Sequence, residues 1–366
     1  MQEPKKTITV ALDVMGADSS PESIMLGGVE AAREMGERLN LVLVGKEEVI
    51  TDFIGRQKDM PSNIVSENAD YAVAMSDAPT EGIRKRNSSI AVGLKMQKEG
   101  RADAFVSAGN TGAVMASSVV TLGKIEGVSR PAIVGLFPTI TGRPALVLDV
   151  GANVDCRPMH LYQFGVMGSI YASLMTGRTS PRVGLISIGE EKSKGNEQTF
   201  QTWSLFENSG LNFIGNVEGR DILEAKADVI VMDGFVGNII LKFAESVESY
   251  LTRKIKHQVQ TNIFSRIGAT LMTPFLKRLR NTFDYSEYGG APLLGVDGVC
   301  IICHGASSPK AIKNAVMVAA DMYRHKISEN IRKEMALNNG NGIKNGQDSK
   351  NENNRTGIFP SVSPSD

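Results

Sequence analysis

The chain has 366 residues, of which 42% are hydrophobic and 22% are charged, so it can bury a large core in one domain or two lobes. Its 40 basic residues equal its 40 acidic residues in number, and this balance gives the whole molecule no bias toward nucleic acid. Residues 1–7 are mostly polar or charged, and no apolar stretch reaches the roughly 20 residues that span a bilayer. We therefore expect a cytoplasmic protein.

Apolar, strand-like runs alternate with helix-period segments from Thr7 to about Asn238. The helix that follows Ser20 has a hydroxyl cap, a proline in its first turn and an acidic residue near its positive end. The predicted strands are residues 8–14, 41–44, 104–106, 145–148, 183–188 and 229–232, and the predicted helices are 21–35, 88–100, 112–122 and 157–176. Helices of this length between strands indicate crossover connections, and hence a layered α/β/α fold with a mostly parallel sheet.

We expect one α/β domain over residues 1–336. From Leu337 the chain is rich in Asn, Gly, Ser and Lys and loses its periodicity, which predicts a disordered tail over residues 337–366. A protruding helical arm is predicted at about residues 238–283. No acidic residue occurs between Glu248 and Asp284 within that arm, whereas basic and apolar residues recur throughout it.

The predicted arm carries both positive charge and apolar surface. Its spacing indicates two amphipathic helices that break around residues 261–265 and stop at Pro274. Such a surface suits an acidic protein partner, an anionic membrane or the second subunit of a dimer, and these alternatives are compatible. The residues expected to make these contacts are Arg253, Lys254, Lys256, Ile263, Phe264 and Ile267.

Five of the predicted strands end in turns built from Gly, Asn and Asp, and a further polar turn follows residues 213–214. In an open α/β sheet, ligands bind outside the carboxyl ends of the strands, where glycine lets the backbone approach them. Each residue alone is more typical of a turn, but together they indicate one composite site for a small polar or anionic ligand. The candidate ligand-binding residues are Asp13, Gly16, Asp18, Ser107, Gly109, Asn110, Thr111, Asp149, Asn153, Glu191, Asn216, Glu218, Asp233 and Gly237.

A lysine in the loop after residues 183–188 is the strongest single candidate for a role in chemistry. Asn196 can cap the helix that follows, which places Lys194 near the positive end of that helix. A lysine there is unfavourable unless it faces an anion. Lys192 is the weaker candidate, and the alternative is a solvated loop whose two acids and two lysines neutralise one another.

No protein nucleophile can be assembled from this sequence with conviction. Of the four histidines only His304 lies in a loop suited to a site, and the glycine-rich signatures of P-loop, Rossmann and serine-hydrolase sites do not occur. We therefore expect direct transfer between bound substrates. No cofactor or resident metal is predicted, although aspartates at the strand ends could ligate magnesium.

Cys300 and Cys303 precede His304 in the C-x-x-C-H pattern of haem attachment. Residues 299–303 nevertheless have the composition of a buried strand, where free cysteine behaves as a small hydrophobe. No second cysteine pair completes a zinc site. We therefore predict no haem, zinc or redox role for these cysteines.

Several of these motifs occur in one order along the chain. They are DVMGAD at 13–18, SAGNTGA at 107–113, DVGAN at 149–153, GEE at 189–191, KGNE at 194–197, GNVEG at 215–219, DGFVGN at 233–238, YGGA at 288–291, and HG with SS over 304–308. Together they resemble the bacterial phosphate acyltransferase family of phospholipid synthesis, PlsX. The match is collinear from about residue 7 to 325, and the combination is far more specific than any single motif.

The resemblance implies a fold like that of phosphotransacetylases and of isocitrate and isopropylmalate dehydrogenases. It implies a homodimer at the inner face of the membrane that transfers a long-chain acyl group from acyl carrier protein to inorganic phosphate. The acyl phosphate would serve a membrane glycerol-3-phosphate acyltransferase. Lys194, Asn238 and His304 are then the expected catalytic residues. The alternatives are a short-chain enzyme that uses coenzyme A, a metal-dependent dehydrogenase on the same fold, and a non-catalytic scaffold for lipid enzymes.

Overall fold

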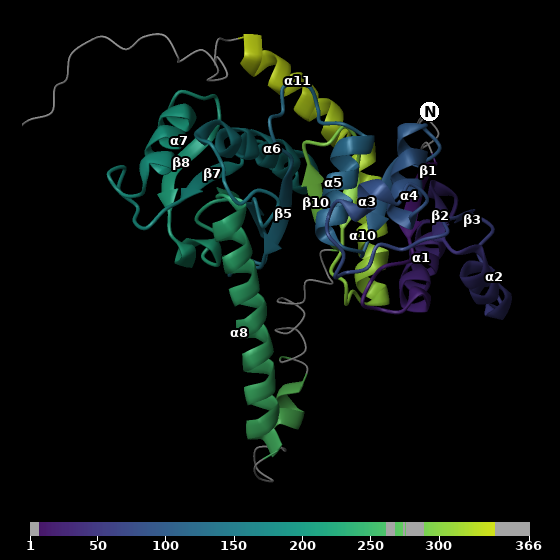
Figure 1. Ribbon diagram of the computed structural model, residues 1–366. Helices are drawn as coiled ribbons and strands as arrows, with labels where there is room; N and C mark the ends of the chain where they lie inside the picture. The colour runs from purple at the N-terminus through teal and green to yellow at the C-terminus, as the bar shows by residue number, and fades with distance from the viewer. Residues whose placement is uncertain (1–6, 261–267, 274, 276–288, 341–366) are drawn as a thin grey trace, which may run out of the picture.

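One mixed sheet of eleven strands organises the computed structural model, which describes residues 7–260, 268–273, 275 and 289–340 (Figure 1). The strands are β1 (Ile8–Asp13), β2 (Leu39–Gly45), β3 (Ile64–Asn68), β4 (Ala104–Ser107), β5 (Ala132–Phe137), β6 (Ala145–Leu148), β7 (Arg182–Ile186), β8 (Asn212–Val217), β9 (Val229–Val231), β10 (Ala291–Leu294) and β11 (Cys300–Ile302). Their order is β3-β2-β1-β4-β11-β10-β5-β6-β9-β7-β8. The antiparallel pairs are β11–β10, β10–β5 and β5–β6. They join two parallel groups, β3-β2-β1-β4-β11 and β6-β9-β7-β8.

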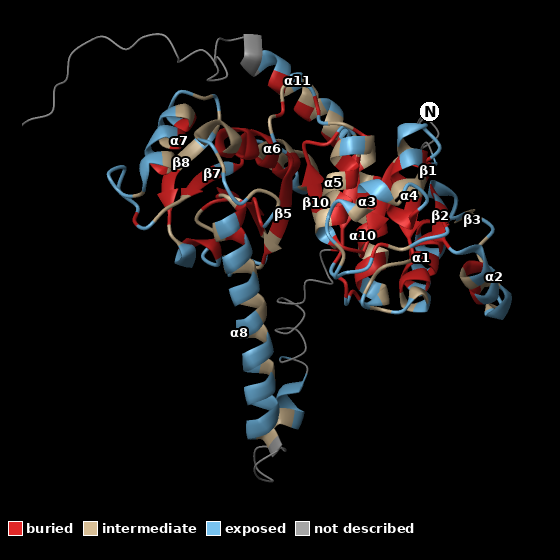
Figure 2. Cartoon of the chain, viewed as in Figure 1, coloured by how far each residue is buried: buried red, intermediate tan, exposed pale blue. Residues whose placement is uncertain are grey.

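Helices cover both faces of this sheet. They are α1 (Pro21–Met35), η1 (Gly36–Arg38), α2 (Glu47–Arg56), α3 (Glu81–Arg84), α4 (Ser89–Lys98), α5 (Thr111–Thr121), α6 (Pro158–Thr176), α7 (Glu197–Glu207), η2 (Gly219–Ile222), α8 (Gly234–Gln260), α10 (Pro309–Arg324) and α11 (Ile327–Gly340). In β1, Val10 and Leu12 belong to the apolar core that contains α1 and α10, whereas Ala11 belongs to the core that contains α4 and α5. This alternation places the two cores on opposite faces of the sheet. Figure 2 shows that the strands of the sheet are largely buried. The predicted α/β/α fold with a mostly parallel sheet is confirmed.

The helix ends follow the capping residues expected from the sequence. Ser20 and Ser88 accept hydrogen bonds from backbone amides in the first turns of α1 and α4. Gly177, with a φ of 71°, ends α6 in a left-handed conformation that favours glycine. Cys300 and Cys303 are both buried, as predicted, and the first of them begins β11.

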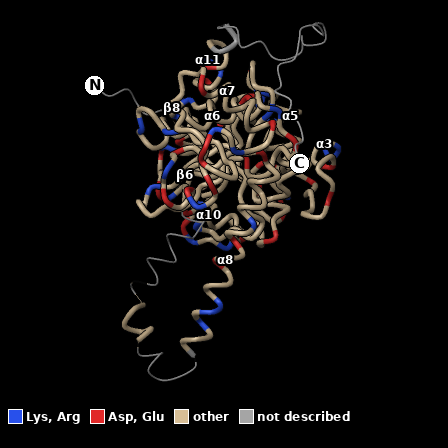
Figure 3. Tube along the Cα trace, turned by 90° about the vertical axis from the view of Figure 1, so that its left-hand side faces the viewer, with Lys and Arg blue, Asp and Glu red and all other residues tan. Residues whose placement is uncertain are grey.

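Helix α8 covers the first part of the predicted arm, up to Gln260, and projects away from the sheet (Figures 1 and 2). It begins at Gly234, four residues before the predicted start of the arm, because Asp233 Oδ1 accepts a hydrogen bond from Val236 N at 2.9 Å and caps the helix. In the part of α8 farthest from the sheet, Figure 3 shows basic residues and no acidic ones. Arg253, Lys254 and Lys256 in this part of the helix are exposed. The predicted break at residues 261–265 lies outside the described residues, as do Ile263, Phe264 and Ile267.

The C-terminal end of the described chain is helical for slightly longer than the sequence predicts. Helix α11 continues to Gly340 and so includes the first four residues assigned to the tail. Ala336 and Leu337 are strong helix formers, which favours this extension. The rest of the predicted tail lies outside the described residues. Within the described ranges, none of the helices has the length and apolar character that crossing a membrane requires.

Candidate functional site

Hydrogen bonds hold the predicted site loops in two clusters, one on each parallel group of strands. The loops after β1, β4 and β11 form what we call the Asp13 cluster. The loops after β6, β7, β8 and β9 form what we call the Lys194 cluster. Three antiparallel pairings separate the two strand groups in the sheet. A single composite site shared by all five glycine-rich loops therefore stays a prediction.

Asp13 is fully buried at the end of β1 and joins that strand to β4. Its carboxylate accepts hydrogen bonds from Met15 N at 2.9 Å and from Ser107 Oγ at 2.7 Å. The Ser107 hydroxyl oxygen in turn accepts from Gly109 N at 3.0 Å. Burial raises the pKa of Asp13 to about 6, against the lowering effect of its hydrogen bonds. This arrangement fixes the two loops relative to each other.

Asn110 holds a neighbouring loop as well as its own helix. Its Oδ1 accepts from Ala113 N at 3.0 Å and caps α5, in which Thr111 is the exposed first residue. Its Nδ2 donates to the carbonyls of Met75 and Asp77 at 3.0 and 2.9 Å. The amide group of Asn110 is thus occupied within the protein. In this structure the side chain positions loops, and its Nδ2 hydrogens are engaged with carbonyls, so it has no donor left for an anion.

Two glycines of the Asp13 cluster mark close approaches, Gly16 to the segment after β3 and Gly305 to the loop after β1. Gly16 has a φ of +75°, and a Cβ added there would lie 2.7 Å from the carbonyl oxygen of Val73. A Cβ added at Gly305 would collide with the carboxylate of Asp18. The preceding residue, His304, is exposed, and its Nδ1 accepts a hydrogen bond from Ala306 N at 3.1 Å. Asp18 and His304 therefore lie in adjoining loops of the Asp13 cluster.

Asp149 is the most heavily hydrogen-bonded of the candidate residues. Its Oδ1 accepts from the amides of Ile133, Gly151 and Ala152 at 3.0–3.2 Å. Its Oδ2 accepts from Asn153 N at 2.7 Å and from Asn153 Nδ2 at 2.9 Å. Burial raises the pKa of Asp149 against these lowering hydrogen bonds. Asn153 Nδ2 makes its second bond to the Pro131 carbonyl at 2.7 Å. Both side chains therefore support the loop rather than present a free group to a ligand.

Helix α8 begins directly against this loop. Gly234 N donates to the Asn153 carbonyl at 2.7 Å, and a Cβ added at Gly237 would collide with the carbonyl oxygen of Asp149. Asp233 acts as the helix cap described above. Asn238 is exposed, and its side chain is 3.6 Å from the position of a Cβ added at Gly151. The Asn238 amide lies at the loop surface and forms no hydrogen bond within the part of the chain that the structure describes.

The turn that carries Lys194 is fixed through its backbone. Asn216 is buried, and its Nδ2 donates to the carbonyls of Glu191 and Lys194 at 3.0 and 3.2 Å. Ser187 Oγ adds a third hydrogen bond, 3.1 Å to the Lys194 carbonyl. Asn196 caps α7 by accepting from the amide in its first turn, as predicted. Because both Asn216 amide hydrogens are used, Asn216 positions this turn and cannot also donate to an anion.

The two lysines of this turn differ in their surroundings. Lys192 Nζ lies 2.8 Å from both carboxylate oxygens of Glu207 and 5.8 Å from the centre of the Trp203 ring. Lys194 is exposed, and in the described part of the chain its ammonium has no ion-pair partner. A Cβ added at Gly189 would lie 2.8 Å from Lys194 Cγ and 3.0 Å from Glu191 Oε2, so both side chains cross the loop there. The structure therefore favours Lys194 over Lys192 as the group that meets an anion.

An ion-pair network braces the other side of this turn. Glu218 pairs with Arg220 at 3.1 Å. Lys226 pairs with Glu190 at 2.9 Å and so joins the turn to the segment after η2. The Glu218 carboxylate is therefore already matched by a cation. This pairing indicates a supporting role for Glu218 in this structure.

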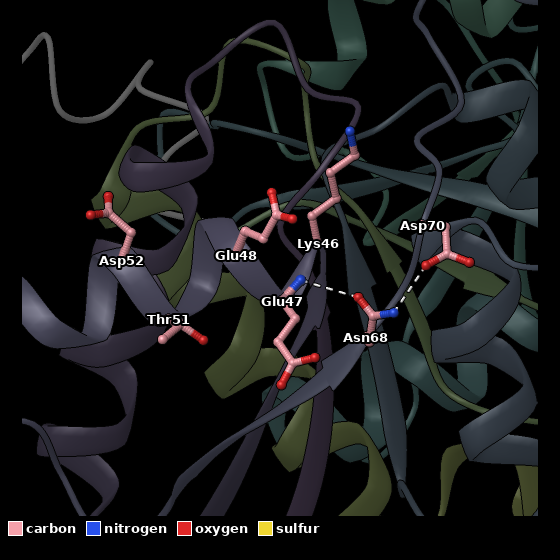
Figure 4. A pocket seen from close by; sticks show the side chains of 7 residues that line it. All are labelled: Lys46, Glu47, Glu48, Thr51, Asp52, Asn68 and Asp70. Atoms are coloured by element: carbon pink, nitrogen blue, oxygen red, sulfur yellow. Dashed lines mark hydrogen bonds between the residues drawn. The ribbon is translucent and has the colours of Figure 1, made fainter.

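A pocket lies elsewhere on the first strand group, at the ends of β2 and β3 (Figure 4). Its lining residues are Lys46, Glu47, Glu48, Thr51, Asp52, Asn68 and Asp70. Four carboxylates oppose one lysine there, which disfavours an anionic ligand. Among the residues that the structure describes, His, Cys, Asp and Glu form no group of three that could hold a metal ion.

Comparison with known proteins identifies both the class of fold and the family. The fold is shared with a phosphotransacetylase from Streptococcus pyogenes, with a TM-score of 0.59 at 15% identity over 86% of this chain and 93% of that one. A protein from Salmonella typhimurium described as a 4-hydroxythreonine-4-phosphate dehydrogenase gives a TM-score of 0.54 at 11% identity over 87% of this chain and 100% of that one. The predicted likeness to phosphotransacetylases is thus confirmed at the level of the fold, and a dehydrogenase-like protein shares that fold.

The sequence comparison is more specific. Residues 8–330 match the family model described as fatty acid synthesis protein. The phosphate acyltransferase of Pelotomaculum thermopropionicum is 46% identical over 88% of this chain and 94% of its own length. The chain therefore belongs to this family of fatty acid synthesis proteins, the phosphate acyltransferases that its motifs resemble, and it is an acyltransferase.

Proposed function

We propose that this acyltransferase moves a long-chain acyl group from an acyl carrier protein thioester to inorganic phosphate. The observation that carries the proposal is the setting of Lys194. Its ammonium is exposed and its turn is fixed by Asn216 and Ser187, close to the N-terminal end of α7. A fixed cation beside the positive end of a helix suits an anionic reactant.

In the proposed reaction, an oxygen of bound phosphate attacks the thioester carbonyl carbon without a covalent acyl-enzyme. The carbon–oxygen bond forms, the carbon–sulfur bond breaks, and the carrier leaves as a thiolate that takes up a proton. Holding the reactants together can supply about 7–11 kcal/mol in favourable cases. Lys194 would stabilise the tetrahedral oxyanion, a role in which losing one donor costs about 100–1,000-fold. Asn238 and His304 complete the proposed catalytic set, and the loops of both clusters would surround the substrates.

The same proposal extends to partners and location. Acyl carrier proteins are acidic, so the exposed cations Arg253, Lys254 and Lys256 on α8 suit their docking. Ile239 and Phe243 on the same helix are 53% and 69% exposed, which supports a second subunit packing there or a membrane surface. We infer a cytoplasmic homodimer associated with the inner face of the membrane, where acyl phosphate would reach a glycerol-3-phosphate acyltransferase.

Acyl phosphate formation tests the proposal directly. Purified protein is incubated with a long-chain acyl carrier thioester and phosphate, with and without magnesium, and the acyl phosphate is trapped with hydroxylamine. We expect phosphate-dependent product, and the magnesium arm decides the metal requirement. A matched coenzyme A thioester identifies the donor. Turnover with coenzyme A thioesters alone would replace the proposed donor, and no acyl phosphate from either thioester would refute the reaction.

A further inference from the structure

Three cationic side chains lie beside the Lys194 cluster without an acidic counterpart. Lys124 and Arg130 belong to the segment between α5 and β5, and Arg157 is the N-cap of α6. All three are exposed. Within the described ranges none of them forms an ion pair, although Glu126 and Asp155 lie in the same loops. Together with His160 we call these three residues the Arg130 patch.

Hydrogen bonds from α6 hold the patch together. Gln163 is buried; its Oε1 accepts from Ser129 N, and its Nε2 donates to the Gly127 carbonyl, both at 2.8 Å. Lys124 Nζ donates to the Ser129 carbonyl at 2.8 Å. One turn earlier on α6, His160 Nδ1 accepts from Arg157 N at 3.2 Å. Arg130 follows Ser129 directly, so these contacts bring the four residues to the same end of α6.

The local potential of the patch is positive. Burial lowers the pKa of His160, and the positive charges of Arg130, Arg157 and Lys124 lower it further. The imidazole is therefore neutral near pH 7, with its proton on Nε2 because Nδ1 accepts a hydrogen bond. Two guanidinium groups, one ammonium and one imidazole N–H thus offer donors to an anion.

The patch is continuous with the loop that follows β6. Pro131, next to Arg130, accepts from Asn153 Nδ2, and Ile133 N donates to Asp149. Arg157 closes that same loop where it enters α6. The cations therefore border the Lys194 cluster and not the pocket at the ends of β2 and β3.

We propose that the Arg130 patch binds a phosphate group of one substrate of the acyl transfer reaction. The inference rests on the proposed function, because both substrates of that reaction carry phosphate groups. Arginine pairs with phosphate through two parallel N–H donors, and unpaired arginines pay no cost of breaking an existing ion pair. Two sources share this chemistry: inorganic phosphate, and the phosphodiester that joins the pantetheine arm to the carrier protein.

Kinetics on the full chain separate the two sources. Arg130→Gln and Arg157→Gln remove a charge each, and the control Arg143→Gln alters an exposed arginine at the far end of the β5–β6 hairpin. We expect each patch variant to raise one Michaelis constant about tenfold relative to the control. A rise for phosphate assigns the patch to the acceptor, and a rise for the acyl donor assigns it to the phosphodiester. Michaelis constants equal to those of the control for both substrates would overturn the proposal.

A binding measurement keeps this test independent of turnover. The chain has 4 histidines, so the His160 imidazole signals can be assigned and titrated by NMR. Inorganic phosphate or 4′-phosphopantetheine bound at the patch should raise the pKa of His160, and Arg130→Gln should abolish that rise. If the wild-type protein forms no acyl phosphate, the proposed function is refuted. The His160 titration would still show whether the Arg130 patch binds phosphate. No shift of His160 with either ligand would overturn the patch proposal.

Discussion

Truncating the buried amide of Asn216 should cost far more activity than stability. Two hydrogen bonds are lost, at about 0.5–1.5 kcal/mol each. Asn216 Oδ1 is buried without a partner in the described structure, so Asn216→Ala also removes an unsatisfied polar atom. We therefore expect the free energy of unfolding to fall by only about 1–2 kcal/mol. The turn that carries Lys194 keeps one side-chain hydrogen bond, from Ser187, and the resulting misplacement should lower kcat/KM roughly 100-fold.

Urea unfolding and acyl phosphate formation, measured on the same preparations, test this prediction. Asn212→Ala is the matched control, because Asn212 lies on the same strand and its exposed amide makes one hydrogen bond, to the Ser180 carbonyl. The control should retain near-normal kcat/KM. Wild-type activity in Asn216→Ala, with the expected loss of stability, would refute the positioning role. Loss of folded protein would mean that Asn216 contributes more to the free energy of unfolding than the about 1–2 kcal/mol expected.

Three further predictions concern stability and docking. Burial raises the pKa of Asp13 from 3.8 to about 6. The stability contributed by the protonated carboxyl group, about 3 kcal/mol, is therefore fully present below pH 3.8 and is lost as the pH rises through 6. In urea unfolding, Asp13→Asn should lack this decline, and identical pH profiles for the two proteins would contradict the prediction. Gly237→Ala should lower the melting temperature sharply, because the added Cβ collides with the Asp149 carbonyl oxygen. Gly219→Ala, which has open space around it, should leave the melting temperature unchanged. Equal melting temperatures for the two variants would show that the start of α8 does not pack against the Asp149 carbonyl. Combined Lys254→Glu and Lys256→Glu should raise the Michaelis constant for the acyl carrier thioester in a salt-dependent manner, and an unchanged constant at low salt would exclude α8 from docking.

The sequence predicts the elements whose signals are local, whereas β3, β5, β10, α2 and α10 are not predicted from it. Ser20 and Gly36 delimit α1, and the alternation in β1 follows from burial on both faces. Cys300 and Cys303 are correctly assigned to the core, because their neighbours are apolar. The helix cap at Asn196 also follows from a local pattern.

The division of labour within the site could not be predicted in the same way. Asn110, Asn153 and Asn216 look like ligands in the sequence, but each donates to carbonyls from distant segments, which only the tertiary structure brings within reach. The pairing of Lys192 with Glu207 likewise joins a loop to the end of a helix. Lys124, Arg130 and Arg157 form no motif, and it is Gln163 that brings their segments together.

The proposed acyl transfer depends most directly on Lys194. Lys194→Ala and Lys192→Ala should be compared for acyl phosphate formation from an acyl carrier thioester and phosphate, with melting curves recorded for both. We predict that Lys194→Ala lowers the rate at least about 100-fold at an unchanged melting temperature, whereas Lys192→Ala stays within a few-fold of the wild-type rate. Near-normal acyl phosphate formation by a fully folded Lys194→Ala protein would contradict the central claim.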